Sequence, residues 1–254
     1  MIEALIDDLL QTQFQINMAD VATAMPCIIT NIHGDFGEQR VDVRPVINEL
    51  MKDGTSVEQP QILSVPVLLP GSEHSLISFP LNIGDTVMCV FSQRSMDNFK
   101  ISTGGPTPPN DFRKHSDQDA VAIPGLRSFP RSVNKPGLRK FPHDPMRDLV
   151  IAHNIASGTE VMIQLKQNGD VIINTDFNVI VNSQTVQVNA TESMSINTPE
   201  LNINAATTNW TGNIIHSGNY TMTGQARFNG RLFDTHTHSG ITPGTGTSGP
   251  VNGV

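Results

Sequence analysis

Cysteine is scarce in this sequence, and its scarcity limits the fold. Only Cys27 and Cys89 occur in 254 residues. Two cysteines are too few for a disulfide framework, so we expect assembly in a reducing compartment, with both thiols buried.

Basic residues and long apolar runs are also few. The chain has 16 Lys and Arg against 24 Asp and Glu, a formal charge of −8. Without clustered Lys and Arg, a nucleic-acid partner is not expected. No stretch offers about 18 uninterrupted apolar residues, and MIEALIDDLLQTQF has acids where a signal peptide needs basic residues. We therefore expect a protein that is soluble when made.

The first 24 residues predict an amphipathic helix. Apolar residues recur at helical spacing, with Asp7 and Asp8 on the other side. They are Ile2, Leu5, Ile6, Leu9 and Leu10. The helix should dock on its own domain or on a neighbouring chain.

Residues 25–99 predict a small β-barrel or sandwich. Five β-like runs are separated by turn-forming segments such as HGDFGE and KDGT. The runs are PCIITNI, QRVDVRPVI, ILSVPVLL, SLISFPL and DTVMCVF. A five-stranded oligonucleotide/oligosaccharide-binding (OB) barrel suits that number of strands.

Residues 100–148 are rich in proline and contain many of the basic residues. We interpret this segment as an ordered loop or linker rather than a set of strands, and as an extension of a barrel domain covering 25–148. Its basic residues either form a docking patch for an acidic neighbour or belong to a solvated linker. They are Arg113, Lys114, Arg127, Arg131, Lys135, Arg139 and Lys140.

From residue 171 the chain repeats a short pattern: apolar, any residue, apolar, Asn. The repeats are offset by eight, seven, eight and seven residues. Each unit predicts one short strand with an apolar pair on one face, which buries little alone and must be covered by its neighbours. The units are Val171-Ile172-Ile173-Asn174, Val179-Ile180-Val181-Asn182, Val186-Gln187-Val188-Asn189, Met194-Ser195-Ile196-Asn197 and Leu201-Asn202-Ile203-Asn204.

The length of the repeat indicates three chains. A single-chain β-helix needs about 18 or more residues per coil to enclose a core. Units of seven or eight residues supply only one side. We therefore predict an intertwined homotrimeric β-helix over residues 149–233, with two further copies supplying the other sides.

The period then shortens to six and leads to a pair of histidines. Gly212, Gly218, Gly224 and Gly230 recur at this interval, and Leu232 lies two residues after the last of them. One further period from Leu232 reaches His238, and His236 lies on the same face of an extended strand. We interpret His216, inside the repeat, as packed or hydrogen-bonded rather than as a ligand.

Two axial histidines per chain predict a metal site at an apex formed by residues 234–254. In a trimer, His236 and His238 provide six imidazoles, a full octahedral shell for a first-row ion such as Fe(II). Zn(II) prefers four ligands and fits less well. Asp234 is the only nearby acid, and the prediction does not depend on it.

A barrel followed by a narrowing trimeric repeat with a His-x-His end resembles the membrane-piercing spike proteins of contractile-tailed bacteriophage baseplates. The resemblance rests on GDTVMCVFSQRSMDNF, DAVAIPGLRSF, the repeat over 171–233 and FDTHTHSGITPGTGTSGP. It implies an OB-fold-like barrel facing the baseplate hub or tail tube, and one buried iron per trimer held by His236 and His238 of each chain. It also implies an all-β structural protein of the virion, at the tip of the tail baseplate and assembled in the host cytoplasm.

The implied function is mechanical. Sheath contraction drives the spike through the outer membrane of a Gram-negative host, with which contact is transient.

One alternative is a metalloenzyme, which would need an open coordination position that six imidazoles do not leave. The other is a tail fibre or adhesin that binds host glycans, although Trp210 and Tyr220 are the only polar-tipped aromatic residues. We expect no enzyme activity.

Overall fold

The computed structural model describes residues 2–19, 21–233 and 244. The chain divides into two compact units, Met1–Asn182 and Ser183–Val254. Strands outnumber helices, and the expectation of an all-β chain is confirmed. Among the described residues, no helix combines the length and the apolar character needed to span a bilayer.

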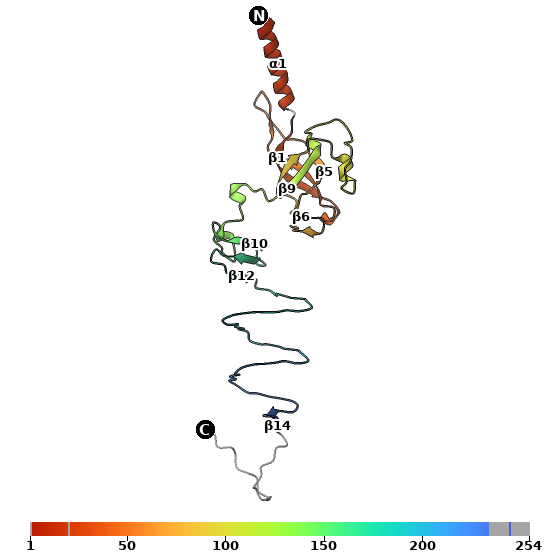
Figure 1. Cartoon of the computed structure of the whole chain (residues 1–254). Helices are drawn as coiled ribbons and strands as arrows, with labels where there is room; N and C mark the ends of the chain where they lie inside the picture. The colour runs from red at the N-terminus through yellow and green to blue at the C-terminus, as the bar shows by residue number, and fades with distance from the viewer. Residues whose placement is uncertain (1, 20, 234–243, 245–254) are drawn as a thin grey trace. The chain divides into compact units, whose positions relative to one another are not determined.

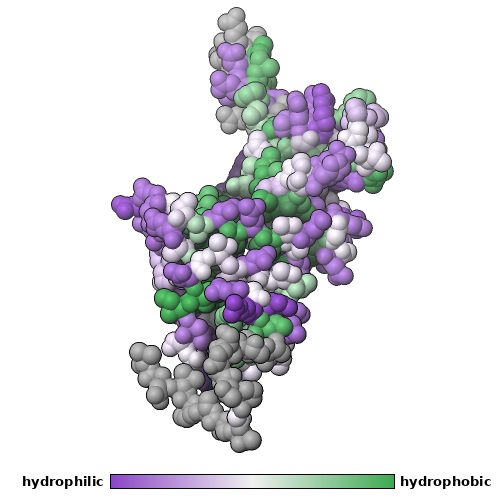
Figure 2. All heavy atoms as spheres, turned by 60° about the horizontal axis from the view of Figure 1, so that its bottom comes forward, coloured by the Kyte–Doolittle hydropathy of each residue, from purple (hydrophilic) through white to green (hydrophobic). Residues whose placement is uncertain are grey.

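A single long helix, α1 (Ile2–Ala19), opens the chain. It continues past Leu10, where the predicted helical spacing ended. Figure 2 shows hydrophobic residues along one side of this helix and hydrophilic residues along the other. Five of its large apolar side chains are exposed: Ile6, Leu9, Leu10, Phe14 and Met18.

A five-stranded sheet forms the main core of the first unit (Figure 1). Its order is β5-β2-β1-β8-β9, with antiparallel neighbours throughout. A parallel bridge between Val67 and Ala122 joins the two edges at one point, so the sheet curls into a partly closed barrel. The strands are β1 (Ala24–Ile32), β2 (Arg40–Pro45), β5 (Ile62–Pro66), β8 (Thr86–Phe91) and β9 (Ala120–Pro124).

Alternating side chains of these strands fill the barrel interior. Cys27 and Cys89 are both fully buried and both free thiols, which confirms their predicted burial. Each buried aliphatic side chain contributes about 1.5–3 kcal/mol of transfer free energy. The other fully buried members are Ile29, Val41, Val43, Val65, Val87, Ala120 and Ala122.

The fifth barrel strand is not the one that the sequence predicted. The run SLISFPL forms only β7 (Ser75–Leu76), which pairs with β6 (Gly71–Ser72). The fifth strand is β9, inside the segment expected to be a linker. Its inward side chains are alanines, which fit the narrow interior but have low strand propensity, so the run carried a weak pattern.

Residues 100–148 supply the barrel strand β9 and are anchored by the ion pairs of Arg113 and Arg139, although most of the other residues of the segment are exposed. Besides β9 they contain short 3₁₀ turns that begin with Pro or are closed by side chains. The remaining short elements of this unit are η1 (Gly34–Phe36), β3 (Glu49–Leu50), β4 (Ser56–Val57), α2 (Asp97–Lys100), η2 (Asp117–Asp119), η3 (Phe129–Arg131) and η4 (Pro136–Leu138).

A second, three-stranded antiparallel sheet follows the proline-rich segment. It consists of β10 (Leu149–His153), β11 (Val161–Leu165) and β12 (Val171–Asn174), in that order. Burial alternates along each strand, so the sheet has one covered face and one exposed face. The strand β12 is also the first unit of the repeat.

The rest of the repeat forms no strand within one chain. No strand occurs over residues 175–226, and the part of this stretch that belongs to the second unit, residues 183–226, runs back and forth (Figure 1). No backbone hydrogen bond joins residues 175–225 to one another or to the other described residues. Because a β-helix of three chains is not tested by one chain, the trimeric needle stays a prediction.

The glycines with a period of six share one backbone conformation. All four have positive φ, between 77° at Gly230 and 127° at Gly218. L-residues are strained in this region and glycine is not. The six-residue period of glycine is therefore also a period of positive φ.

Candidate functional site

The predicted metal ligands His236 and His238 lie outside the described residues, as does Asp234. Within the part of the chain that the structure describes, no cluster of three or more His, Cys, Asp or Glu side chains has the arrangement of a metal site. The predicted iron site therefore stays a prediction. The structure does describe the residues that precede it, up to Phe233.

The last described elements before the histidines form a hairpin. The strands β13 (Arg227–Phe228) and β14 (Arg231–Leu232) pair in an antiparallel arrangement. The turn residues Asn229 and Gly230 have φ of 50° and 77°, which suits a tight two-residue turn between antiparallel strands. The six-residue period predicts one more repeat unit here, whereas the structure has a hairpin. Asn-Gly is the strongest short-range sequence signal for such a hairpin.

Phe233 fixes the exit from this hairpin. Its amide donates to the Ala226 carbonyl at 2.9 Å, and its ring meets Phe228 edge-on with centroids 5.8 Å apart. The chain thus enters the predicted apex from a locally ordered turn.

His216 has partners within its own chain. Its Nε2 lies 3.1 Å from the Asn219 carbonyl oxygen, and its ring stands edge-on to Tyr220. This contact agrees with the interpretation of His216 as hydrogen-bonded.

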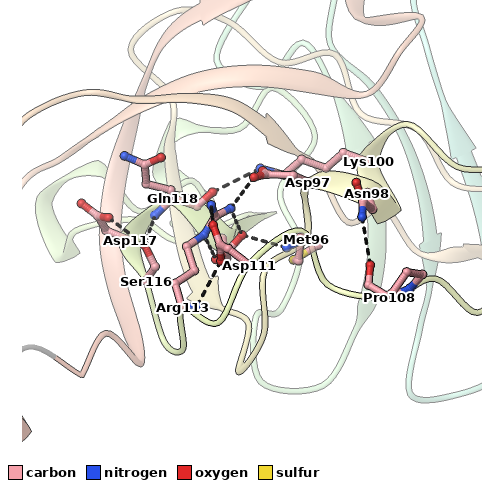
Figure 3. Close-up of polar contacts among 11 residues, drawn as sticks. Met96, Asp97, Asn98, Lys100, Pro108, Asp111, Arg113, Ser116, Asp117 and Gln118 are labelled. Atoms are coloured by element: carbon pink, nitrogen blue, oxygen red, sulfur yellow. Dashed lines mark hydrogen bonds and ion pairs between the residues drawn. The ribbon is translucent and has the colours of Figure 1, made fainter.

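Arg113 is the centre of an ion-pair cluster in the loop between β8 and β9 (Figure 3). Its Nε and Nη2 hold both carboxylate oxygens of Asp119, at 2.7 and 2.9 Å. Nη2 also binds Asp97 at 2.7 Å, and Nη1 binds Asp111 at 2.8 Å. The cluster ties three points of one loop together.

Asp119 carries the electrostatics of this cluster. Its side chain is fully buried, and the Met96 amide donates to it at 2.8 Å. Burial by itself would raise the pKa of this carboxyl, but the hydrogen bonds from Arg113 and Met96 outweigh it and the pKa is lowered. Asp119 is therefore held ionised, as a structural anchor.

Glu160 has the same role beneath the second sheet. Its carboxylate accepts from Arg139 Nε at 2.6 Å and from the Lys140 amide at 3.0 Å. Both ionic side chains are buried, at 0% and 3% exposure. Burial would raise the pKa of Glu160, but these donors and the Ala156 amide lower it overall.

A cleft of about 690 Å³ lies beside the exposed side of β5 and the loop that contains α2. Strands two and three of an OB barrel, with the loop between strands four and five, commonly carry its ligand site. The lining mixes charged, amide and apolar side chains, among them Arg40, Leu63, Asn98, Lys100, Ile101 and Gln118.

Residues 25–125 match one protein family, described as the phage protein Gp138 N-terminal domain. No curated protein matches the chain. The matched segment contains the curled sheet from the second residue of β1 to the end of β9, and covers less than half of the 254 residues. The barrel of this chain is therefore similar to the N-terminal domain of the phage protein Gp138, in keeping with the phage resemblance of the sequence.

Proposed function

We propose that three copies of this chain form the central spike of a contractile phage tail baseplate. In this function the spike pierces the outer membrane of a Gram-negative host when the sheath contracts, and is a component of the virion. The similarity of residues 25–125 to a phage protein domain supports an assignment to phages. The piercing function is what the resemblance to membrane-piercing baseplate spike proteins implies.

The exposed apolar repeat is the observation that carries this proposal. In one chain its paired apolar residues lie open to solvent, for example Val186 and Val188 at 66% and 63% exposure. Among the described residues, no backbone–backbone hydrogen bond involves residues 175–225, and only a few of their backbone groups have side-chain partners, such as the Asn219 carbonyl with His216. An extended strand with both edges free and one apolar face is unstable alone, and pairing with identical strands satisfies both needs.

A trimer with these contacts is suited to mechanical loading. Backbone hydrogen bonds between chains would leave few free edges, so local unfolding becomes costly. The positive-φ glycines allow the tight turns that a narrow shaft requires.

We also propose a metal ion at the tip of the trimer. The donor set of two histidines per chain fits an octahedral first-row ion, and we keep Fe(II) as the proposed ion. Bound there, the ion would tie the three chains to one another at the tip. A closed shell of this kind leaves no position for substrate, so the proposed protein is not an enzyme.

The barrel would face the baseplate. We propose that it docks on a hub or tail tube protein, without nucleic acid, since the chain is acidic overall.

Elemental analysis with solution mass tests the tip. We expect one iron per three chains in the wild type, and loss of iron with retention of the trimer in His236→Ala/His238→Ala. His216→Ala is the matched control, because His216 already has the Asn219 carbonyl as a partner; it should retain the iron. A trimer without iron, or iron retained in the double variant, contradicts the metal assignment.

A glycan-binding adhesin is the second candidate, favoured by the cleft beside β5. Its amide and charged lining could hold a saccharide, which an OB barrel can bind at this face. A glycan array with the full chain and with Lys100→Ala decides. Binding that Lys100→Ala abolishes would support the adhesin, and no binding favours the spike.

A further inference from the structure

One face of the sheet β10-β11-β12 is exposed to solvent, and most of its side chains are aliphatic. Six residues on this face are 38–65% exposed. They are Leu149, Ile151, Ile163, Leu165, Val171 and Ile173.

Strand register places these six side chains in two rows. Leu149, Leu165 and Val171 are cross-strand neighbours, and so are the three isoleucines of the second row. Directly opposed side chains in antiparallel strands contact one another, so the two rows form one continuous apolar patch. Soluble monomers rarely expose a patch of this kind without using it.

The chain itself covers only the opposite face. There Met162 and Gln164 are buried, Gln164 donates to Asp148 at 2.6 Å, and Arg139 Nη2 contacts the Met162 sulfur. The buried Arg139–Glu160 pair fixes the proline-rich segment on that side. The open face has no such cover among the described residues.

The repeat indicates that the partner of this exposed face is another copy of the same chain. In β12, the first and third positions of the unit, Val171 and Ile173, lie on the open face. The same two positions are apolar in each of the four following units, as in Val179 and Val181. The apolar patch of the sheet therefore continues, in sequence register, into the surface that the proposed trimer buries.

The chemistry of the patch favours self-association. Its six side chains are uncharged aliphatics, and the one ionisable side chain on this face of the three strands, His153, lies beyond them at the end of β10. A patch of this kind is self-complementary, as symmetric assemblies require. We propose that this face packs against the same face of two further copies around a threefold axis, so that the trimer closes at the sheet that contains the first repeat unit. The proposal rests on the homotrimer proposed above.

The test places a charge at the centre of the patch in the full chain. In Ile163→Glu, three carboxylates would meet at the axis and would have to be buried unpaired. The matched control is Ile123→Glu, since Ile123 is an outward strand residue of the barrel with 37% exposure against 38% for Ile163. Light scattering over a concentration series measures the trimer mass and its dissociation.

We expect the wild type and Ile123→Glu to be trimers, and Ile163→Glu to dissociate at a protein concentration roughly tenfold higher or more. An Ile163→Glu trimer as stable as the control overturns the packing of this face while leaving the homotrimer intact. A monomeric wild type overturns both.

A second variant does not depend on weakening the assembly. In Ile163→Cys, thiols of neighbouring copies come together near the axis, and the oxidant diamide should give disulfide-linked dimers on a non-reducing gel. Ile123→Cys should give none, and Cys27 and Cys89 are buried. A trimeric Ile163→Cys that forms no linked dimer also overturns the proposal.

Discussion

Asp119 and Glu160 show how single residues give order to segments of little regular structure. Each is a buried carboxylate with an arginine partner and at least one backbone amide donor. Removing one partner of a buried pair leaves the other charge uncompensated, so such residues are much more sensitive than surface pairs. The sequence placed Arg113 and Arg139 in a docking patch or linker, because neither acid lies next to its partner in the sequence.

Glu160→Gln should lower the free energy of unfolding by about 3–5 kcal/mol, because it leaves the Arg139 guanidinium buried without a counter-charge. The measurement is chemical denaturation of the full chain. Glu58→Gln is the control: Glu58 pairs with Arg44 on the surface and should change stability by about 0.5 kcal/mol or less. Equal unfolding midpoints for the two variants would refute the role of Glu160.

Acid should destabilise the first unit through the same carboxylates. The pKa values of Asp119 and Glu160 are lowered in the folded state, so their stabilisation is present above the unfolded pKa of about 4. It is lost as the pH falls through the folded values.

We expect the denaturation midpoint to be steady between about pH 7 and 5 and to fall below about pH 4. In Asp119→Asn, which starts from a lower midpoint, the acid slope should be shallower. An acid slope as steep as that of the wild type would show that Asp119 does not contribute.

At the scale of elements, the sequence predicted four of the five barrel strands. The runs around β1, β2, β5 and β8 alternate large apolar residues with polar ones, which is the pattern of a half-buried strand. Strand β9 was missed because its inward residues are alanines, and the β13–β14 hairpin was missed because its Asn-Gly turn fell on the glycine period. Tertiary packing decided the outcome for β9, whereas the local Asn-Gly turn explains the hairpin.

Ala122→Leu tests whether β9 belongs to the barrel core. The Ala122 side chain is fully buried, so a larger residue should overpack the interior and lower stability by about 1–3 kcal/mol. Ile123→Leu, at the neighbouring outward position, should have little effect in the same denaturation experiment. Similar midpoints would contradict the placement of β9 in the core.

Gly224→Ala tests the backbone geometry of the repeat. Gly224 has φ of 121°, a conformation that strains alanine, so we expect a loss of at least about 1 kcal/mol per chain. The thermal midpoint of the repeat should therefore fall. Gly105→Ala is the control, since its Cβ meets open space and its φ is not positive. If the control lowers the midpoint as much as Gly224→Ala, the positive-φ requirement is wrong.

At the scale of the whole molecule, the two units differ in whether the apolar residues of their alternating patterns are buried within one chain. In the first unit, apolar alternation is matched by a buried core within one chain. In the second unit the repeat has the same kind of alternation, but its apolar side chains are exposed and no backbone–backbone hydrogen bond forms over residues 183–225. The short repeat in the sequence predicts that each strand needs neighbouring strands to cover it. The structure of one chain adds that these neighbouring strands do not come from the same chain over residues 175–226.

Hydrogen exchange of the repeat tests the central claim most directly. We expect the full chain to have three times the chain mass of 27.6 kDa in solution. Amides over residues 175–225 should exchange far more slowly than those of an unstructured peptide, because they would be bonded between chains. A chain of single mass whose repeat amides exchange at the unprotected rate would contradict the trimeric shaft and, with it, the spike.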